Sequence, residues 1–216
     1  LVNLDKSNMP SYQPEAYQKP GCPIIVDLNG DGLITVEDVD MKNVIPSLYW
    51  GFGNTFTYKN WDLDVFIYSQ LGVDKYNDVY SWTSGRGLGN QTNNMSVYIK
   101  DVWHSELNPN GTIPGIAYEM ASVSLPGGAG TDIGYENSSF VRVRNITLGY
   151  NFKPNQLGAL SKLLSGIRVY VDVQNPFTFT GYTGLDPEVN TGGNYKGGKA
   201  EYPQTRTFSL GAKLSF

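Results

Sequence analysis

The sequence predicts an all-β fold in which each long strand has one apolar and one polar face. Three observations support this prediction. The 216 residues are rich in glycine (25) and tyrosine (15), several segments alternate strictly between apolar and polar residues, and the connections between these segments are alternately short and long. Successive side chains of a strand point to opposite faces, so a hydropathy period of two residues indicates strands rather than helices.

Five segments carry the alternation. They span residues 47–58, 61–71, 139–152, 167–180 and 205–216. The last is the clearest, because apolar residues at every second position from Phe208 to Phe216 are separated by small or polar ones. In 139–152 the apolar positions change parity after Val143, which predicts a β-bulge near Arg144 and Asn145.

The connections help to choose between two architectures. Lys59-Asn60 forms a two-residue hairpin turn and 153–166 is a short connection with room for one or two helical turns, whereas 72–138 and 181–204 are long loops. In a soluble β-sandwich the apolar faces form the core, and in an outer-membrane barrel they meet lipid. Alternating long and short connections favour the barrel. Five strands cannot close a barrel, so this interpretation requires further strands from a longer polypeptide.

Residues 27–38 match the spacing of a twelve-residue calcium-binding loop. The predicted ligands are Asp27, Asn29, Asp31, the Leu33 carbonyl, Thr35 and Asp38. Gly32 permits the sharp turn at the sixth position, and the curled backbone would gather the oxygens that a hard cation prefers. The alternative is an ion-free turn, because the last position holds Asp instead of the longer Glu. A bound Ca²⁺ would be structural, since metal-assisted hydrolysis needs an open position and a nearby base.

Composition argues against several functional classes. A net charge of −4 without a cluster of Lys and Arg is not typical of nucleic-acid-binding proteins. The single cysteine, Cys22, excludes an internal disulfide, and the single histidine, His104, leaves little room for a His-based triad. Asp62 and Asp64 share one strand face and do not face each other across a cleft, as the carboxylates of a glycoside hydrolase must. We therefore expect no enzymatic activity.

Five stretches together resemble a known family. They read DLNGDGLITVED, YWGFGNTFTYKNWDLDVFIYSQLG, SSFVRVRNITLGYNF, IRVYVDVQNPFTFTGYTGLDPEV and YPQTRTFSLGAKLSF, and from the first to the last they span residues 27–216. Their order is similar to that in the C-terminal part of the barrel of SusC/RagA-type TonB-dependent transporters of Bacteroidetes outer membranes. Pro176 and Thr205 depart from the family pattern, which usually has an apolar residue and a proline there.

The resemblance implies the C-terminal strands of a transmembrane antiparallel barrel of about 22 strands with a plugged lumen. In this interpretation residues 1–46 are an extracellular loop segment, and 47–216 are barrel strands with long extracellular loops. The family imports oligosaccharides or peptides across the outer membrane of Gram-negative bacteria. Its partners are a SusD-like surface lipoprotein, TonB, the remaining plug and barrel, and membrane lipid. The barrel-assembly machinery is a further partner, which recognises a terminal aromatic residue such as Phe216. The alternative function is that of a secreted, calcium-stabilised β-sandwich that binds carbohydrate.

Loop aromatics are the candidate substrate contacts, because flat rings stack on the apolar faces of sugars. The four candidates are Trp82, Trp103, Tyr182 and Tyr195.

Overall fold

The computed structural model describes residues 10–77, 96–115, 132–189 and 202–216. These residues fall into two compact units. The sheet unit contains the described residues of Asn43–Lys75, Asn137–Asn190 and Glu201–Phe216. The loop unit contains those of Leu1–Lys42 and Tyr76–Glu136. Each unit is described by itself.

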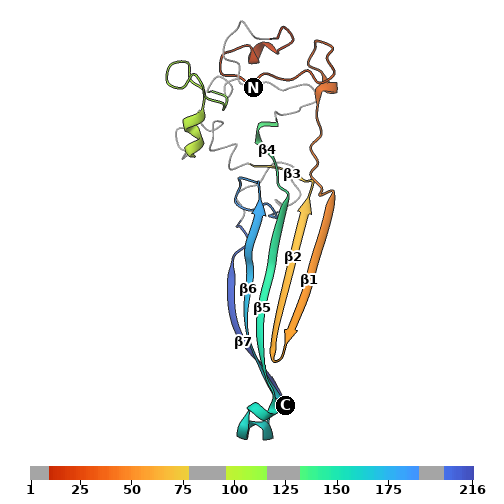
Figure 1. Cartoon of the computed structure of the whole chain (residues 1–216). Coiled ribbons are helices and arrows are strands. Elements are labelled where there is room, and N and C mark those ends of the chain that lie inside the picture. Colours follow the sequence, from red (N-terminus) through yellow and green to blue (C-terminus); the bar gives the residue numbers. More distant parts are fainter. Residues whose placement is uncertain (1–9, 78–95, 116–131, 190–201) are drawn as a thin grey trace. The chain divides into compact units, whose positions relative to one another are not determined.

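The sheet unit is built on five long antiparallel strands (Figure 1). They are β1 (Leu48–Tyr58), β2 (Trp61–Leu71), β5 (Phe140–Phe152), β6 (Gly166–Thr180) and β7 (Thr207–Ser215), in the sheet order β1-β2-β5-β6-β7. Each long strand therefore pairs with the long strand that follows it along the chain. Their bounds lie within two residues of the segments that the alternation predicts.

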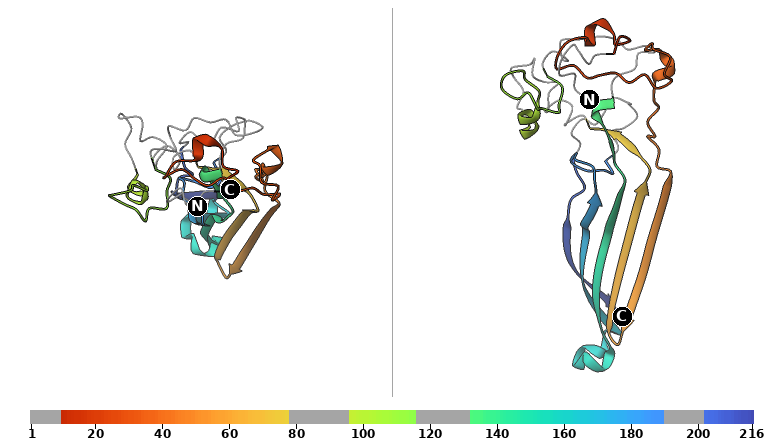
Figure 2. Two further views of the ribbon diagram at one scale, coloured as in Figure 1. Left: turned by 90° about the horizontal axis from the view of Figure 1, so that it is seen from above. Right: turned by 45° about the horizontal axis from the view of Figure 1, so that its top comes forward.

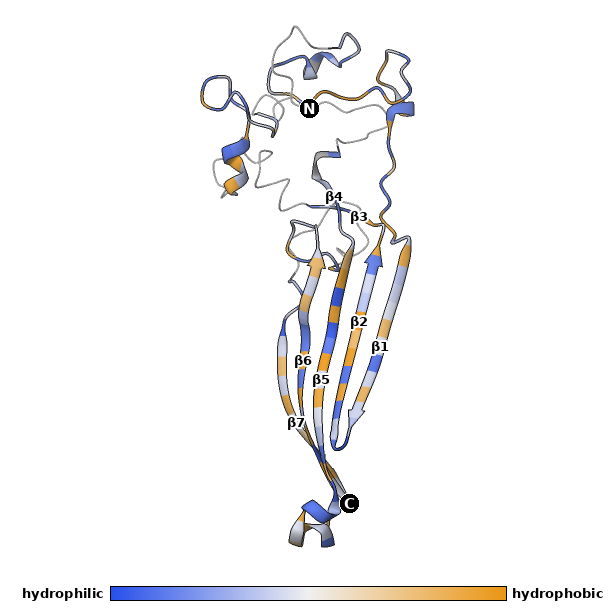
Figure 3. Ribbon diagram, viewed as in Figure 1, coloured by the Kyte–Doolittle hydropathy of each residue, from blue (hydrophilic) through white to orange (hydrophobic). Residues whose placement is uncertain are grey.

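The register places apolar residues in rows that cross all five strands. In one row Phe56 pairs with Leu63, Leu63 with Leu148, Leu148 with Val171, and Val171 with Leu210. Figure 3 shows the alternation along each strand as stripes of opposite hydropathy. Phe56 is 57 % exposed and Leu210 is 77 % exposed. A β-sandwich would bury these side chains under a second sheet, so the exposed face contradicts the sandwich alternative.

The predicted β-bulge is present in β5. In the β2–β5 register the pair Phe66–Asn145 is followed by the pair Ile67–Val143, so Arg144 is an extra residue of β5. On the other side of β5, Arg144 lies opposite Asn175 and Pro176, which gives β6 an extra residue of its own. Asn175 adopts a left-handed backbone with φ of 49°. Its amide nitrogen donates a hydrogen bond to the Thr205 carbonyl at 3.0 Å. The bulge restores the pairing of apolar residues on both sides of the change in parity.

Both short connections and the carboxyl end of the chain lie at one end of the sheet (Figures 1 and 2). The connection after β5 forms two 3-10 helices, η7 (Pro154–Gln156) and η8 (Gly158–Lys162), where one or two helical turns are predicted. Asn60 of the β1–β2 turn donates to the Gln156 side chain at 2.7 Å. The amide of Ser165 donates to the Ser215 carbonyl at 2.8 Å.

The remaining elements are short. Strands β3 (Asp74–Tyr76) and β4 (Tyr135–Asn137) pair with each other. The 3-10 helices are η2 (Glu15–Tyr17), η3 (Val36–Asp38), η4 (Val97–Asp101) and η6 (Asp132–Gly134). In the loop unit Cys22 is fully buried, and this burial raises the pKa of its thiol. Within the described residues no helix is long and apolar enough to cross a membrane.

Candidate functional site

The polar face of the sheet carries an ion pair that skips one strand. Arg168 of β6 and Asp62 of β2 lie on either side of β5, and the Arg168 Nε lies 3.2 Å from both carboxylate oxygens. Between them lies Gly149 of β5. A Cβ atom at this position would lie 2.6 Å from Asp62 Oδ2 and 2.7 Å from Arg168 Nε. Glycine at residue 149 therefore leaves room for the ion pair in this geometry, and a side chain there would displace the ends of both partners.

Aromatic rings on the same face lie over glycines of neighbouring strands. The Tyr170 ring lies over Gly211, and the Arg168 guanidinium lies 5.0 Å from the centre of that ring. Phe66 lies over Gly51 and Gly53, where added Cβ atoms would lie 3.3 and 3.4 Å from its ring. The glycines leave room for these rings to lie along the sheet.

Further hydrogen bonds join polar side chains across this face. Thr55 donates to Asp64 at 2.5 Å, and Thr147 donates to Asp172 at 2.5 Å. Asn151 donates to Asp62 at 2.6 Å. Carboxylates, hydroxyls and amides on one face with hydrocarbon on the other match the two sides of a membrane barrel wall, where one side is wet and the other meets lipid.

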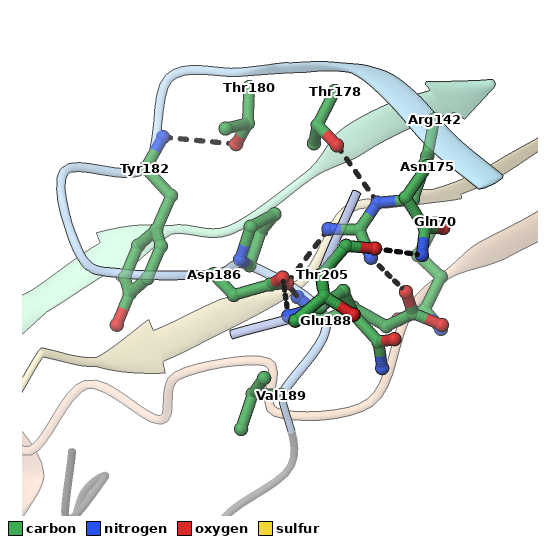
Figure 4. A network of polar contacts seen from close by, with 12 residues as sticks. Gln70, Arg142, Asn175, Thr178, Thr180, Tyr182, Asp186, Glu188, Val189 and Thr205 are labelled. Carbon is green, nitrogen blue, oxygen red and sulfur yellow. Dashed lines mark hydrogen bonds and ion pairs between the residues drawn. The ribbon is translucent and has the colours of Figure 1, made fainter. Parts of the chain in front are cut away.

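A buried arginine holds the segment that follows β6, residues 181–189, which we call the strap. The Arg142 side chain of β5 is 2 % exposed. Its Nη2 lies 2.8 Å from Asp186, its Nη1 lies 2.5 Å from Glu188, and its Nε donates to Thr178 at 2.9 Å (Figure 4). Arg144 adds a second ion pair to Glu188 at 2.9 Å. A buried arginine with three such acceptors is paired and hydrogen-bonded, as a buried charge must be.

Asp186 accepts more hydrogen bonds than a single contact to Arg142. Its carboxylate accepts the backbone N–H of Glu188 at 2.8 Å and that of Gln204 at 2.9 Å, in addition to Arg142. Burial by itself would raise the pKa of Asp186, but the two backbone donors and the arginine outweigh it and hold this pKa below its usual range. Asp186 is therefore a carboxylate at neutral pH.

Lys75 of β3 contacts the strap at its backbone. Its ammonium lies 3.4 Å from the carbonyl oxygens of Asp186 and Pro187, and it also donates to the Val189 carbonyl. The same ammonium lies 5.6 Å from the centre of the Tyr182 ring. One lysine from the loop after β2 thus contacts both ends of the strap.

The predicted substrate aromatics lie in different environments. The Tyr182 ring packs against Gly184 and Lys75, and its backbone N–H donates to Thr180 at 3.1 Å. The Trp103 ring of the loop unit lies over Gly21, and its buried indole nitrogen has no hydrogen-bond partner among the described residues. Trp82 and Tyr195 lie outside the described residues. Substrate contact by these four residues stays a prediction.

The loop at 27–38 has a tight curl that its own carboxylates maintain. Asp27 accepts the N–H groups of Gly30 at 2.7 Å and Gly32 at 2.8 Å. Asp38 accepts those of Leu28 at 2.8 Å and Thr35 at 2.7 Å, which joins the two ends of the loop. The bond from Thr35 is the main reason that the pKa of Asp38 lies below its usual range.

The ligand oxygens of this loop are turned toward backbone donors. Asp31 accepts the N–H of Leu33 at 2.8 Å, and the Asn29 amide nitrogen donates to Asp31 and Glu37, both at 3.1 Å. Among the described residues, no group of three or more His, Cys, Asp and Glu side chains is placed to share one metal ion. Each carboxylate oxygen has a second lone pair, so the hydrogen bonds do not exhaust the capacity of the loop for a cation.

Comparison with known proteins gives relatives among outer-membrane receptors and transporters, in agreement with the two unlike faces of the sheet. No family model matches the chain. The TonB-dependent receptor SusC of Bacteroides thetaiotaomicron is 33 % identical over 95 % of this chain, and TonB-dependent receptor P3 of Formosa agariphila is 31 % identical over 91 %. The RagAB peptide transporter structure superposes with a TM-score of 0.62 at 28 % identity over 81 % of this chain. The predicted resemblance to SusC/RagA-type TonB-dependent receptors is thereby confirmed.

The SusC/RagA-like chain spans 19 % of the length of each of these two receptors and 18 % of the solved transporter chain. Its antiparallel sheet matches part of the RagAB fold, so the all-β prediction is confirmed. The relatives are named as receptors and a transporter, which agrees with the expectation that the chain is not an enzyme. Sequence reasoning missed the Arg142 network. Its only signal was the pair Arg142 and Arg144, which places two cations within three residues of an otherwise apolar strand segment.

Proposed function

We propose that this chain supplies C-terminal barrel strands to a TonB-dependent importer in the outer membrane of a Gram-negative bacterium. The observation that supports this most directly is the sheet with two unlike faces. One face presents exposed apolar rows across five paired strands, and the other presents joined ion pairs and hydrogen bonds. Lipid would cover the apolar face, and the aqueous lumen would meet the polar face. The similarity to SusC and RagAB supports import as the activity.

The cargo in this proposal is an oligosaccharide or a peptide, and the importer works as the barrel component of a SusCD-like complex. Its partners are a SusD-like surface lipoprotein, TonB, and the rest of the plug and barrel. The barrel-assembly machinery would read Phe216, which is 82 % exposed at the carboxyl end. The similarity to RagAB, which is named as a peptide transporter, supports a peptide as the cargo. The name of the relative SusC specifies no cargo, so an oligosaccharide is the other candidate.

Uptake by cells that carry the whole importer tests this function. A strain with the gene deleted and a complemented strain are each supplied with fluorescent oligosaccharides and, separately, fluorescent peptides. We expect one of these classes to enter only the complemented strain, and uptake to stop when TonB is deleted. Equal uptake by both strains, or recovery of the protein in the soluble fraction, contradicts the proposal.

We also propose that the loop at 27–38 binds one structural Ca²⁺. Support comes from the ligand spacing and from the curl that Asp27 and Asp38 maintain. Calorimetric titration of the purified full-length importer with Ca²⁺ tests this. The double variant Asp27→Asn with Asp31→Asn should lose one equivalent of bound ion, whereas Asp40→Asn, just outside the loop, should retain it. Unchanged stoichiometry in the double variant contradicts the proposal.

Contact between cargo and the loop aromatics is a further part of the proposed function. Alanine variants of Trp82, Trp103, Tyr182 and Tyr195 should raise the KM for uptake, because each removes a flat stacking surface. Tyr202→Ala is the matched control, since Tyr202 is 81 % exposed and lies outside the set. If none of the four variants changes KM beyond this control, cargo is bound elsewhere.

A further inference from the structure

We propose that the strap, residues 181–189, is a rigid clamp that joins the base of the loop after β2 to the base of the loop after β6. The contacts that hold the strap all lie within the sheet unit. Only its location at the extracellular mouth of a barrel depends on the proposed function. Three cations hold it: Arg142 and Arg144 contact its side chains, and Lys75 contacts its backbone.

The first attachment is Arg142, which fixes the side chains of the strap to the strand β5. Its two terminal nitrogens contact Asp186 and Glu188, and its Nε donates a hydrogen bond to the Thr178 hydroxyl. The Arg142 guanidinium also lies 5.2 Å from the centre of the Phe140 ring, so an aromatic face covers it. Any movement of the strap away from β5 would leave this buried cation without its two carboxylate partners, which is costly.

The second attachment is Lys75, which belongs to the loop after β2. Its ammonium lies among the carbonyl oxygens of three strap residues, Asp186, Pro187 and Val189. These carbonyls have no partner of their own in a strand ladder, because β6 ends at Thr180. The lysine therefore supplies hydrogen bonds that a regular strand would otherwise provide.

The third attachment closes the loop after β6 on itself. The carboxylate of Asp186 accepts the N–H of Gln204, which lies 18 residues further along the chain. Tyr182 is fixed to Thr180 at the other end of the strap. Both long loops thus begin or end at one cluster of groups around Asp186, so displacement of one loop base must break contacts of the other.

Hydrogen exchange of the full-length importer in detergent, followed by mass spectrometry, tests the clamp. Arg142→Met should make the amides of Glu188 and Gln204 exchange at least about tenfold faster, because both donate to the carboxylate that Arg142 holds. The matched control is Arg168→Met, which removes another strand-bridging arginine that does not contact the strap. It should leave these amides unchanged.

The link between the two loops has its own test. Lys75→Met keeps the apolar stem but removes the ammonium, and it should accelerate exchange at Gln204, although Gln204 belongs to the other loop. Lys59→Met, in the hairpin turn at the opposite end of the sheet, is the control. If Arg142→Met does not fold, the isosteric Asp186→Asn replaces it. The clamp is disproved if both amides exchange at unprotected rates in the wild type, or if Lys75→Met leaves Gln204 unchanged. Neither readout depends on import.

Discussion

Asp62 and Arg168 form an ion pair across a strand that has a glycine at the point where the two side chains meet. The two residues belong to β2 and β6, and β5 passes beneath their contact with Gly149 at the crossing point. Side-chain pairs in sheets normally join adjacent strands. Here a glycine extends the reach of such a pair to the second neighbour, so three strands are held by one contact.

Gly149→Ala should destabilise the folded sheet by at most about 1 kcal/mol, because the new methyl group displaces the flexible ends of both partners and a partly exposed ion pair contributes little to stability. The free energy of unfolding of the full-length protein, measured by urea titration in lipid or detergent, is the readout. Gly166→Ala is the control, since a Cβ atom there would meet only the Phe152 carbonyl at 3.6 Å. Equal effects of the two substitutions would show that the ion pair does not need the glycine.

Leu210→Arg should destabilise the membrane-inserted protein by about 2–4 kcal/mol, since it places a charge in the middle of the apolar face. Ser209→Arg, the neighbouring residue on the polar face, should be tolerated. Heat-modifiable migration and the yield of assembled protein in outer-membrane fractions report the difference. The assignment of the two faces is wrong if Ser209→Arg is the more damaging change.

Lys59→Gly should stabilise the β1–β2 hairpin by about 1 kcal/mol. Lys59 has a φ of 55°, a left-handed conformation that glycine adopts without a steric penalty. Asn60→Gly is the contrasting variant, because it removes the hydrogen bond to Gln156 and should destabilise the protein. Urea unfolding measures both variants. A loss of stability in Lys59→Gly would show that the lysine side chain matters more than the backbone.

Protection of the strap should persist to about pH 4 and disappear below it. The pKa of Asp186 is lower in the folded protein than in the unfolded chain. The carboxylate therefore stabilises the fold above its unfolded pKa of about 3.9, and this contribution is lost as the pH falls through the folded pKa. Protection factors of the Gln204 amide, corrected for intrinsic exchange at each pH, are the measurement. Asp186→Asn should abolish this dependence, and the same profile in that variant would assign it to another group.

Sequence alone predicts the sheet well because its signals are local. The alternation from Phe208 to Phe216 defines a strand without reference to its partner, and the change of parity after Val143 locates the bulge. The turn at Lys59-Asn60 follows from the short distance between two alternating segments. These features depend on residues close in the chain, where the physical rules of strands and turns apply directly.

The Arg142 network is not predictable in this way, because its acceptors are far along the chain. Asp186 and Glu188 follow Arg142 by 44 and 46 residues, and nothing in the local sequence pairs them with it. Tyr182 illustrates the same difficulty. Its sequence position suggests an available ring, whereas the fold packs that ring against Gly184 and Lys75. The calcium-type motif predicts a curl correctly but does not show that its oxygens turn toward backbone donors.

The rings of Phe66 and Tyr170, each resting on glycines, determine how smooth the inner wall of a barrel would be. An aromatic ring that projects from a barrel wall occupies part of the lumen, whereas a ring that lies flat against glycine backbone occupies little of it. In the proposed barrel, side chains in place of these glycines would push the two rings away from the backbone and into the lumen. The glycines would therefore determine how much of the lumen these rings occupy.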